Sequence, residues 1–100
     1  LVVTNPTHFA IALRYVAEEG GAPGVLAKGK DLIALTIREI AQKHDIPVME
    51  DKALARSMYD HVEVDRSIPP EFYKAVAQLF YYLYQRNGGH ASVTRSLGSS

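Results

Sequence analysis

The sequence predicts an α/β domain with a small mixed four-stranded sheet, flanked by about three to four helices. Short apolar runs typical of strands alternate along the chain with longer segments of helical periodicity. Between residues 25 and 50 the predicted order is strand, helix, strand, which is the usual connection between parallel strands. One hundred residues with a hydrophobic fraction of 47% suffice for one small core and leave little room for a second domain.

The first two strands are predicted at residues 1–4 and 8–15, on either side of a turn at Asn5-Pro6. A residue before proline prefers extended backbone, so Asn5 suits the end of a strand. Alternation places Phe9, Ile11, Leu13 and Tyr15 on one face of the second strand, and Ala10, Ala12 and Arg14 on the other. Because nearly all of these are apolar, we expect an interior strand that is covered on both faces.

A third strand and the first long helix follow the glycine-rich loop at residues 20–24. The strand is predicted at residues 25–28, closed by Gly29, and the helix at residues 31–44, with Asp31 as its N-cap. Helical spacing predicts that one apolar stripe of this helix packs on the sheet. The stripe consists of Ile33, Ile37, Ile40, Ala41 and His44, widened by Leu32 and Leu35.

The second half of the chain adds a strand and two helices. The strand is predicted at residues 46–50, where Pro47 favours the start of a strand or an edge position. Asp51 is expected to cap a short helix through about Tyr59, which would bury Leu54, Ala55 and Met58. Residues 62–65 are predicted to be extended, but their pattern is too weak for a core strand.

The last helix is predicted to open at Pro69-Pro70-Glu71, because proline is tolerated in a first helical turn. Asn87 and the two glycines after it are a stop signal. The domain is therefore expected to span residues 1–86, and the Ser/Gly-rich residues 87–100 are expected to form a disordered tail. The predicted core stripe of the helix is Phe72, Val76, Leu79, Phe80 and Leu83.

Composition argues against several kinds of partner. The 11 basic and 11 acidic residues balance, so the domain as a whole has no attraction for nucleic acid or anionic lipid. The absence of cysteine excludes disulfides and thiolate metal sites, and His44 and His61 lack the spacing of metal ligands. No apolar run approaches the roughly 18 residues of a membrane helix. We expect no cofactor, no metal, no nucleic acid and no small-molecule substrate.

Asn5-Pro6 carries an unusual chemical possibility. In most Asn-X pairs, the backbone nitrogen of X attacks the asparagine side chain, and the result is deamidation. Proline has no N–H, so that route is closed. The Asn5 side-chain nitrogen can still attack its own main-chain carbonyl carbon. The product is a succinimide at Asn5, and Pro6 leaves as a secondary amine.

An amide nitrogen is a poor nucleophile, so the fold must assist it. A tight turn between paired strands can hold the nitrogen near the carbonyl, and such positioning contributes up to about 7–11 kcal/mol. Backbone N–H groups of the turn can stabilise the oxyanion by ~2.7–4 kcal/mol each. His8 or a water can move the proton, and Thr7 can hold the shape of the turn by hydrogen bonding.

The dipeptide alone leaves two hypotheses open. Asn-Pro commonly initiates turns, and a histidine beside an apolar strand is more often structural than catalytic. The chain is therefore either a self-processing module or a small α/β binding domain or hydrolase fragment in which Asn5-Pro6 is only a turn. Mass analysis of the purified chain distinguishes them, because cleavage yields a fragment that begins at Pro6.

The run VVTNPTHFAIALRY at residues 2–15 resembles the cleavage region of the FlhB/YscU family of flagellar and injectisome export proteins. Other segments resemble the family in the same order, at residues 22–29, 35–41, 46–48, 54–56 and 68–73. The resemblance covers about residues 1–86, and the combination is specific although each piece alone is weak. Ala22-Pro23 favours the flagellar branch, and residues 87–100 match no pattern of the family.

The resemblance implies a component of the type III export apparatus that lies at the cytoplasmic face of the bacterial inner membrane, with membrane helices upstream. It implies one intramolecular cleavage rather than enzymatic turnover, with Asn5 as nucleophile, Pro6 as leaving group, and Thr7 and His8 assisting. The two pieces stay associated, and the protein takes part in switching export substrate specificity. Implied partners are other export-gate membrane components, export substrates or their chaperones, and a secreted hook- or needle-length control protein.

Overall fold

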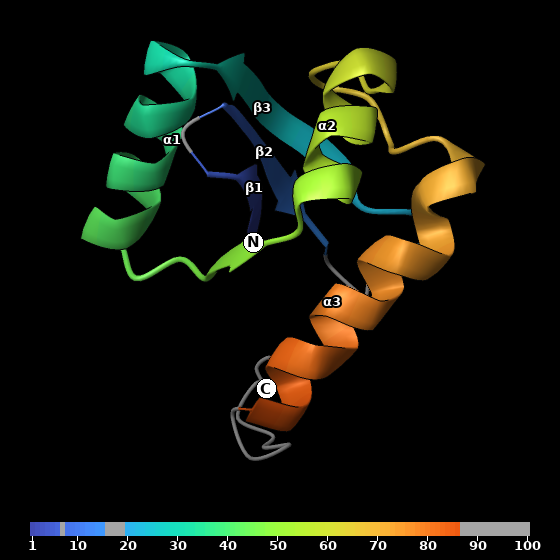
Figure 1. Ribbon diagram of the computed structural model, residues 1–100. Coiled ribbons are helices and arrows are strands. Elements are labelled where there is room, and N and C mark those ends of the chain that lie inside the picture. The colour runs from blue at the N-terminus through green and yellow to red at the C-terminus, as the bar shows by residue number, and fades with distance from the viewer. Residues whose placement is uncertain (7, 16–19, 87–100) are drawn as a thin grey trace.

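A four-stranded mixed sheet lies at the centre of the fold, in the order β3-β2-β1-β4 (Figure 1). The computed structural model describes residues 1–6, 8–15 and 20–86. The strands are β1 (Val2–Asn5), β2 (Phe9–Arg14), β3 (Gly24–Lys30) and β4 (Val48–Glu50). β2 pairs antiparallel with β1 and β3, whereas β4 pairs parallel with β1. The predicted α/β class and mixed sheet are confirmed.

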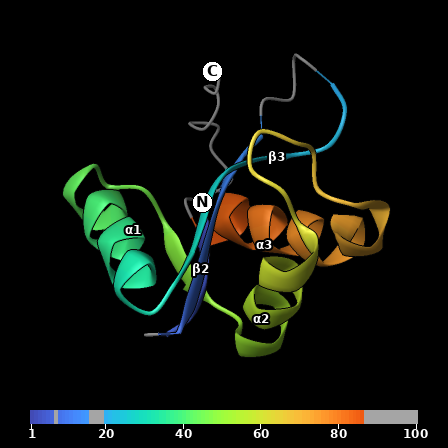
Figure 2. The same cartoon turned by 90° about the horizontal axis from the view of Figure 1, so that it is seen from above.

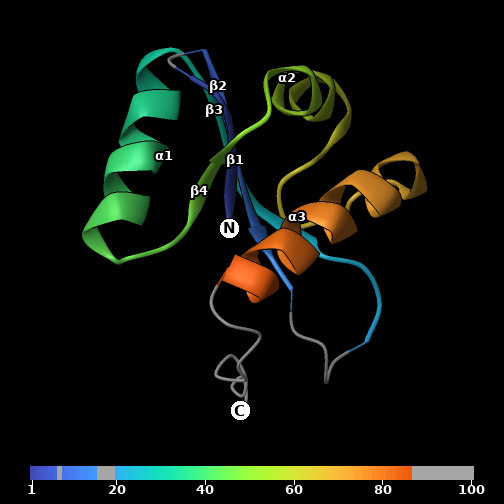
Figure 3. The ribbon, with the colours of Figure 1, turned by 60° about the horizontal axis from the view of Figure 1, so that its bottom comes forward.

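Helices cover both faces of this sheet. They are α1 (Leu32–Lys43), α2 (Lys52–His61), the short 3₁₀ helix η2 (Pro70–Phe72) and α3 (Tyr73–Arg86). Viewed along the edge of the sheet, α1 lies on one face while α2 and α3 lie on the other (Figures 2 and 3). The sheet is therefore the middle of three layers, and its interior strands can bury side chains on both sides.

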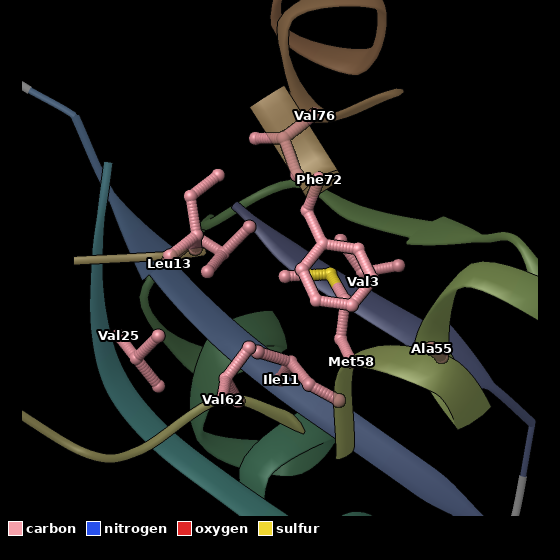
Figure 4. Packing of buried hydrophobic residues seen from close by; sticks show 10 residues of the cluster. Val3, Ile11, Leu13, Val25, Ala55, Met58, Val62, Phe72 and Val76 are labelled. Carbon is pink, nitrogen blue, oxygen red and sulfur yellow. The ribbon is translucent and has the colours of Figure 1, made fainter. Parts of the chain in front are cut away.

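The larger core lies between the sheet and the α2/α3 layer (Figure 4). Val3 and Ile11 come from neighbouring strands and are fully buried, as is Met58 of α2. A smaller cluster on the α1 side contains Val2, Ala10, Ala34 and Ala41. Residues of β1 and β2 thus contribute alternately to the two clusters, which confirms the prediction that β2 is an interior strand covered on both faces.

The predicted buried stripe of α1 is confirmed for Ala41 and for the half-buried Ile37, but it is wrong for its other members. Ala34 and Ala41 are its buried residues, whereas Ile33 and Ile40 are 58% and 53% exposed. The sheet surface beneath α1 is made of small residues, in the cross-strand pairs Ala10–Gly29 and Ala12–Ala27. A flat surface of this kind lets the helix approach closely on its own small residues. The bulky side chains therefore point away from the contact.

Gly29 is part of this close contact. The sequence predicted that Gly29 closes this strand, but it lies inside β3 and is buried. A Cβ atom at this position would come within 2.8 Å of Ile33 Cβ and 3.1 Å of the Ile33 carbonyl carbon. The start of α1 must move for any larger residue to fit.

Gly29→Ala is therefore expected to lower the free energy of unfolding by about 1–2 kcal/mol through overpacking. Gly24→Ala is the matched control in the same strand, because its Cβ would meet only Arg66 O at 4.0 Å. That change should be neutral or slightly stabilising. Urea denaturation of both variants checks the pair, and equal midpoints would show that α1 does not constrain Gly29.

The remaining elements follow the predictions with small shifts. Asp51 caps α2, since its carboxylate accepts a hydrogen bond from Leu54 N at 3.2 Å. β4 is an edge strand that starts directly after Pro47. Residues 64 and 65 form a turn instead of extended chain, with Asp65 at φ 70°. The predicted tail, residues 87–100, lies outside the described residues.

Candidate functional site

Asn5 ends an interior strand, and a short hairpin loop follows it. Asn5 pairs with Phe9, so residues 6–8 form the connection between β1 and β2. Asn5 and Pro6 are half-buried and His8 is exposed, while Thr7 lies outside the described residues. The bond between Asn5 and Pro6 therefore lies at the boundary between an ordered strand and its turn.

The main-chain carbonyl of Asn5 accepts a hydrogen bond within the loop. The His8 backbone N–H donates to this oxygen at 2.9 Å. This carbonyl is the group that the Asn5 side chain would attack in a cyclisation. The same N–H is therefore in place to stabilise an oxyanion there, at roughly 2.7–4 kcal/mol for a well-placed donor.

The side chain of Asn5 is held by the start of α2. Its Nδ2 donates to the carbonyl oxygen of Lys52 at 3.4 Å. The start of α2 is itself fixed to β1, because Asp51 N donates to Thr4 O at 2.9 Å. Asp51 then caps the helix through Leu54 N. The Asn5 amide nitrogen is thus restrained by residues that lie far from it in the sequence.

Asp31 approaches the same loop from the junction of β3 and α1. Its backbone N–H donates to His8 O at 2.9 Å, and its carboxylate lies 3.9 Å from His8 Nδ1. The expected N-cap role of this side chain is wrong: it makes no cap hydrogen bond, and its φ of 53° differs from that of a normal N-cap. The main chain turns too sharply here for the carboxylate to reach the first turn of α1.

These contacts give Asn5 and His8, two of the four predicted site residues, definite surroundings. In a cyclisation, Asn5 would contribute both the amide nitrogen and the carbonyl carbon, and Pro6 would contribute the departing nitrogen. The His8 main chain contacts the carbonyl, while its side chain lies on the Asp31 side of the loop. Within the described part of the chain, no three His, Cys, Asp or Glu residues form a group that could hold a metal ion.

Two residues of the site were missed from the sequence. The sequence pattern assigns Asp31 only a helix-capping role and indicates no role for the Lys52 carbonyl. Neither has a local signal, because their contacts with the loop are formed across 23 and 47 positions of sequence.

An apolar groove lies between the β2 end of the sheet and α3. Its volume is about 420 Å³. Tyr15 and Phe80 form part of its wall, with their ring centroids 5.7 Å apart. Its lining residues are Tyr15, Gly21, Ala22, Pro23, Tyr73, Ala77 and Phe80.

Among the helices that the structure describes, none has both the length and the apolar character needed to span a membrane.

Comparison with known proteins gives consistent matches. The model of the FlhB HrpN YscU SpaS family matches residues 1–83. The flagellar biosynthetic protein FlhB of Bacillus subtilis is 48% identical over 85 residues, which are 85% of this chain and 24% of that protein. FlhB of Aquifex aeolicus is 53% identical over 83 residues, which are 83% of this chain and 24% of that protein. The chain thus spans about a quarter of the length of these relatives.

Solved structures share the fold. The cytoplasmic domain of FlhB from Shewanella putrefaciens has a TM-score of 0.78 at 38% identity, covering 84% of this chain and 69% of that one. An Asn→Ala variant of the EscU C-terminal domain has a TM-score of 0.77 at 43% identity, covering 81% of both chains. A Pro→Ala variant of the same domain, at the next position of that protein, matches with the same score.

Proposed function

This chain belongs to the FlhB HrpN YscU SpaS family, and from this premise we propose that it is a self-cleaving domain of a type III protein export apparatus. We propose that it cuts its own backbone between Asn5 and Pro6 and takes part in switching export substrate specificity. The observation that carries the proposal is the pair of contacts on Asn5: the Lys52 carbonyl on its nucleophile and the His8 N–H on its carbonyl.

The reaction requires no water or metal. Asn5 Nδ2 forms a bond to the Asn5 carbonyl carbon, and the electrons of the C=O double bond move to the oxygen. The His8 N–H stabilises that oxyanion. As the oxyanion collapses, the C–N bond to Pro6 breaks. One proton leaves the attacking nitrogen and one reaches the Pro6 nitrogen, so no net proton is consumed. His8 and Thr7 are proposed to assist, His8 by transferring the proton and Thr7 by holding the turn.

An adjacent asparagine and proline also occur in a relative that this chain resembles. The matched EscU structures include replacements of an asparagine by alanine or aspartate, and of the following proline by alanine. These are the residue types that form the proposed scissile bond here. The identity of 43% over most of the chain makes the transfer to Asn5 and Pro6 reasonable.

The pieces should stay together after cleavage. β1 lies between β2 and β4, and Val2 and Val3 are 2% and 0% exposed. Burial of such side chains contributes about 1.5–3 kcal/mol each. Breaking the Asn5–Pro6 bond leaves this packing and the strand ladder in place. The functional consequence is then a freed loop at residues 6–8 and not the loss of a strand.

The partners follow from the family. We propose that the domain acts at the cytoplasmic face of the bacterial inner membrane, next to other export-gate membrane components. Its other partners would be export substrates or their chaperones and a secreted hook- or needle-length control protein. The groove at Tyr15 and Phe80 suits an apolar segment of an unfolded export substrate, because aromatic walls bury such segments well.

The test is the mass of the purified chain after denaturation. We expect a fragment that begins at Pro6, together with a short piece that ends at Asn5 as a succinimide or its hydrolysis product. A chain that stays intact for days under native conditions would reject self-cleavage and leave Asn5-Pro6 as a structural turn.

A further inference from the structure

We propose that Asp31 is a positioning residue for the cleavage, which it assists by orienting the imidazole of His8. This inference rests on the proposed function, because it assigns a residue to the same reaction. Asp31 lies at the junction of β3 and α1, whereas the scissile bond follows β1. The two segments meet because β3 pairs antiparallel with β2, and Lys30 at the end of β3 lies opposite Phe9 at the start of β2.

The main chain fixes Asp31 against the cleavage loop. Asp31 N donates to His8 O at 2.9 Å, and Asp31 O accepts from Leu35 N at 3.1 Å. The residue is thus anchored on one side to the loop and on the other to α1. Its position relative to His8 does not depend on the two side chains alone.

The conformation of Asp31 is strained. Its φ is 53° and its ψ is −116°, a region in which side chains other than glycine are unfavourable. A strained residue of this kind typically costs about 1–3 kcal/mol and persists where the surroundings or a function require it. Glycine would suit the turn better, so the turn alone does not explain an aspartate. The carboxylate provides a reason, since its Oδ1 lies 3.9 Å from His8 Nδ1.

On the His8 side, the Asp31 carboxylate faces one nitrogen of the imidazole ring. Asp31 Oδ1 lies 3.9 Å from His8 Nδ1, and both side chains are about two-thirds exposed. A small rotation or one bridging water would connect them. A carboxylate at Nδ1 holds the proton on that nitrogen and leaves Nε2 free to accept or donate. His8 would then transfer the proton between the Asn5 amide and the Pro6 nitrogen through Nε2.

Two substitutions separate this role from a purely structural one. Asp31→Asn keeps the shape and removes the charge, and it should slow cleavage about two- to fivefold, the range expected for an exposed ion pair. Asp31→Gly removes the side chain and relieves the strain. It should raise the thermal stability while slowing cleavage at least as much as Asp31→Asn does. If Asp31 were merely structural, its replacement would change the thermal stability and the cleavage rate in the same direction.

Asp45→Asn is the matched control. Asp45 is also an exposed aspartate at positive φ (57°), and it lies just beyond the other end of α1. Its replacement should leave the cleavage rate unchanged. The same three changes are also made in a His8→Ala background, where the effect of Asp31→Asn should disappear if Asp31 acts through His8.

The rates are measured by synthesising each chain in a cell-free system, quenching samples in denaturant and weighing the products. Equal rates for wild type and Asp31→Asn, or an equal slowing with and without His8, would overturn the proposal. In either case a cleaving wild-type chain would leave the proposed function standing. A wild-type chain that does not cleave would instead reject the proposed function itself.

Discussion

Replacing Asn5 by alanine is expected to reduce cleavage by at least about 10³-fold, because the variant has no nucleophile. The proposed reaction uses the Asn5 amide nitrogen as its nucleophile. The fold should survive. Asn5 is half-buried, and its side chain makes one long hydrogen bond, to Lys52 O at 3.4 Å. Loss of that bond costs about 1 kcal/mol.

Asn5→Gln is the sharper companion variant. It keeps the amide group but moves the nitrogen by one methylene away from the position that the Lys52 carbonyl selects. A displacement of about 1 Å can slow a positioned reaction by roughly 10²-fold. The cleavage rate is therefore expected to fall from wild type to Asn5→Gln and again to Asn5→Ala. Mass analysis of the fragment that begins at Pro6, sampled over time, measures these rates. Cleavage of Asn5→Ala at the wild-type rate would show that another group breaks the bond.

Lys28→Met is expected to lower the free energy of unfolding by about 3 kcal/mol. The Lys28 ammonium donates to Tyr59 O and Val62 O, each at 2.9 Å, and lies 4.9 Å from the centre of the Tyr59 ring. Both carbonyls belong to the C-terminal end of α2, where a cation is favoured by the helix dipole. Hydrogen bonds to a charged group contribute about 1.5–3 kcal/mol each. Methionine fills a similar volume but satisfies neither carbonyl.

Lys30→Met is its matched control. Lys30 lies two residues further along β3 and is exposed, and its replacement should change stability by less than about 0.5 kcal/mol. Urea denaturation measures both variants, with the midpoint as the readout and an unchanged slope expected. Similar midpoints for the two would show that Lys28 is an ordinary surface lysine.

The reaction proposed at the Asn5–Pro6 bond could be predicted from two adjacent residues. Proline has no N–H, and for that reason the Asn5 side chain is left with its own carbonyl as the target. The order of strands and helices was also predictable, because each depends on a local pattern of apolar residues. The interior place of β2 followed from its two apolar faces, and the cap of α2 followed from Asp51.

Other features depended on which segments meet in space. The sequence placed Ile33 and Ile40 in the core, but small residues on β2 and β3 let α1 pack on Ala34 and Ala41. A helical pattern reveals that a face is apolar, whereas the opposing surface selects which residues are buried.

Some features of the candidate site could likewise be predicted from the sequence, and others depend on the tertiary structure. The sequence by itself determined that Asn5 and Pro6 carry a possible reaction and that the loop lies between two strands. Only the tertiary structure decided which groups surround them: the Lys52 carbonyl on the nucleophile and Asp31 beside His8. These partners are separated from the loop by one or more complete elements of secondary structure. Their contacts result from the packing of the sheet and its helices, which no local pattern specifies.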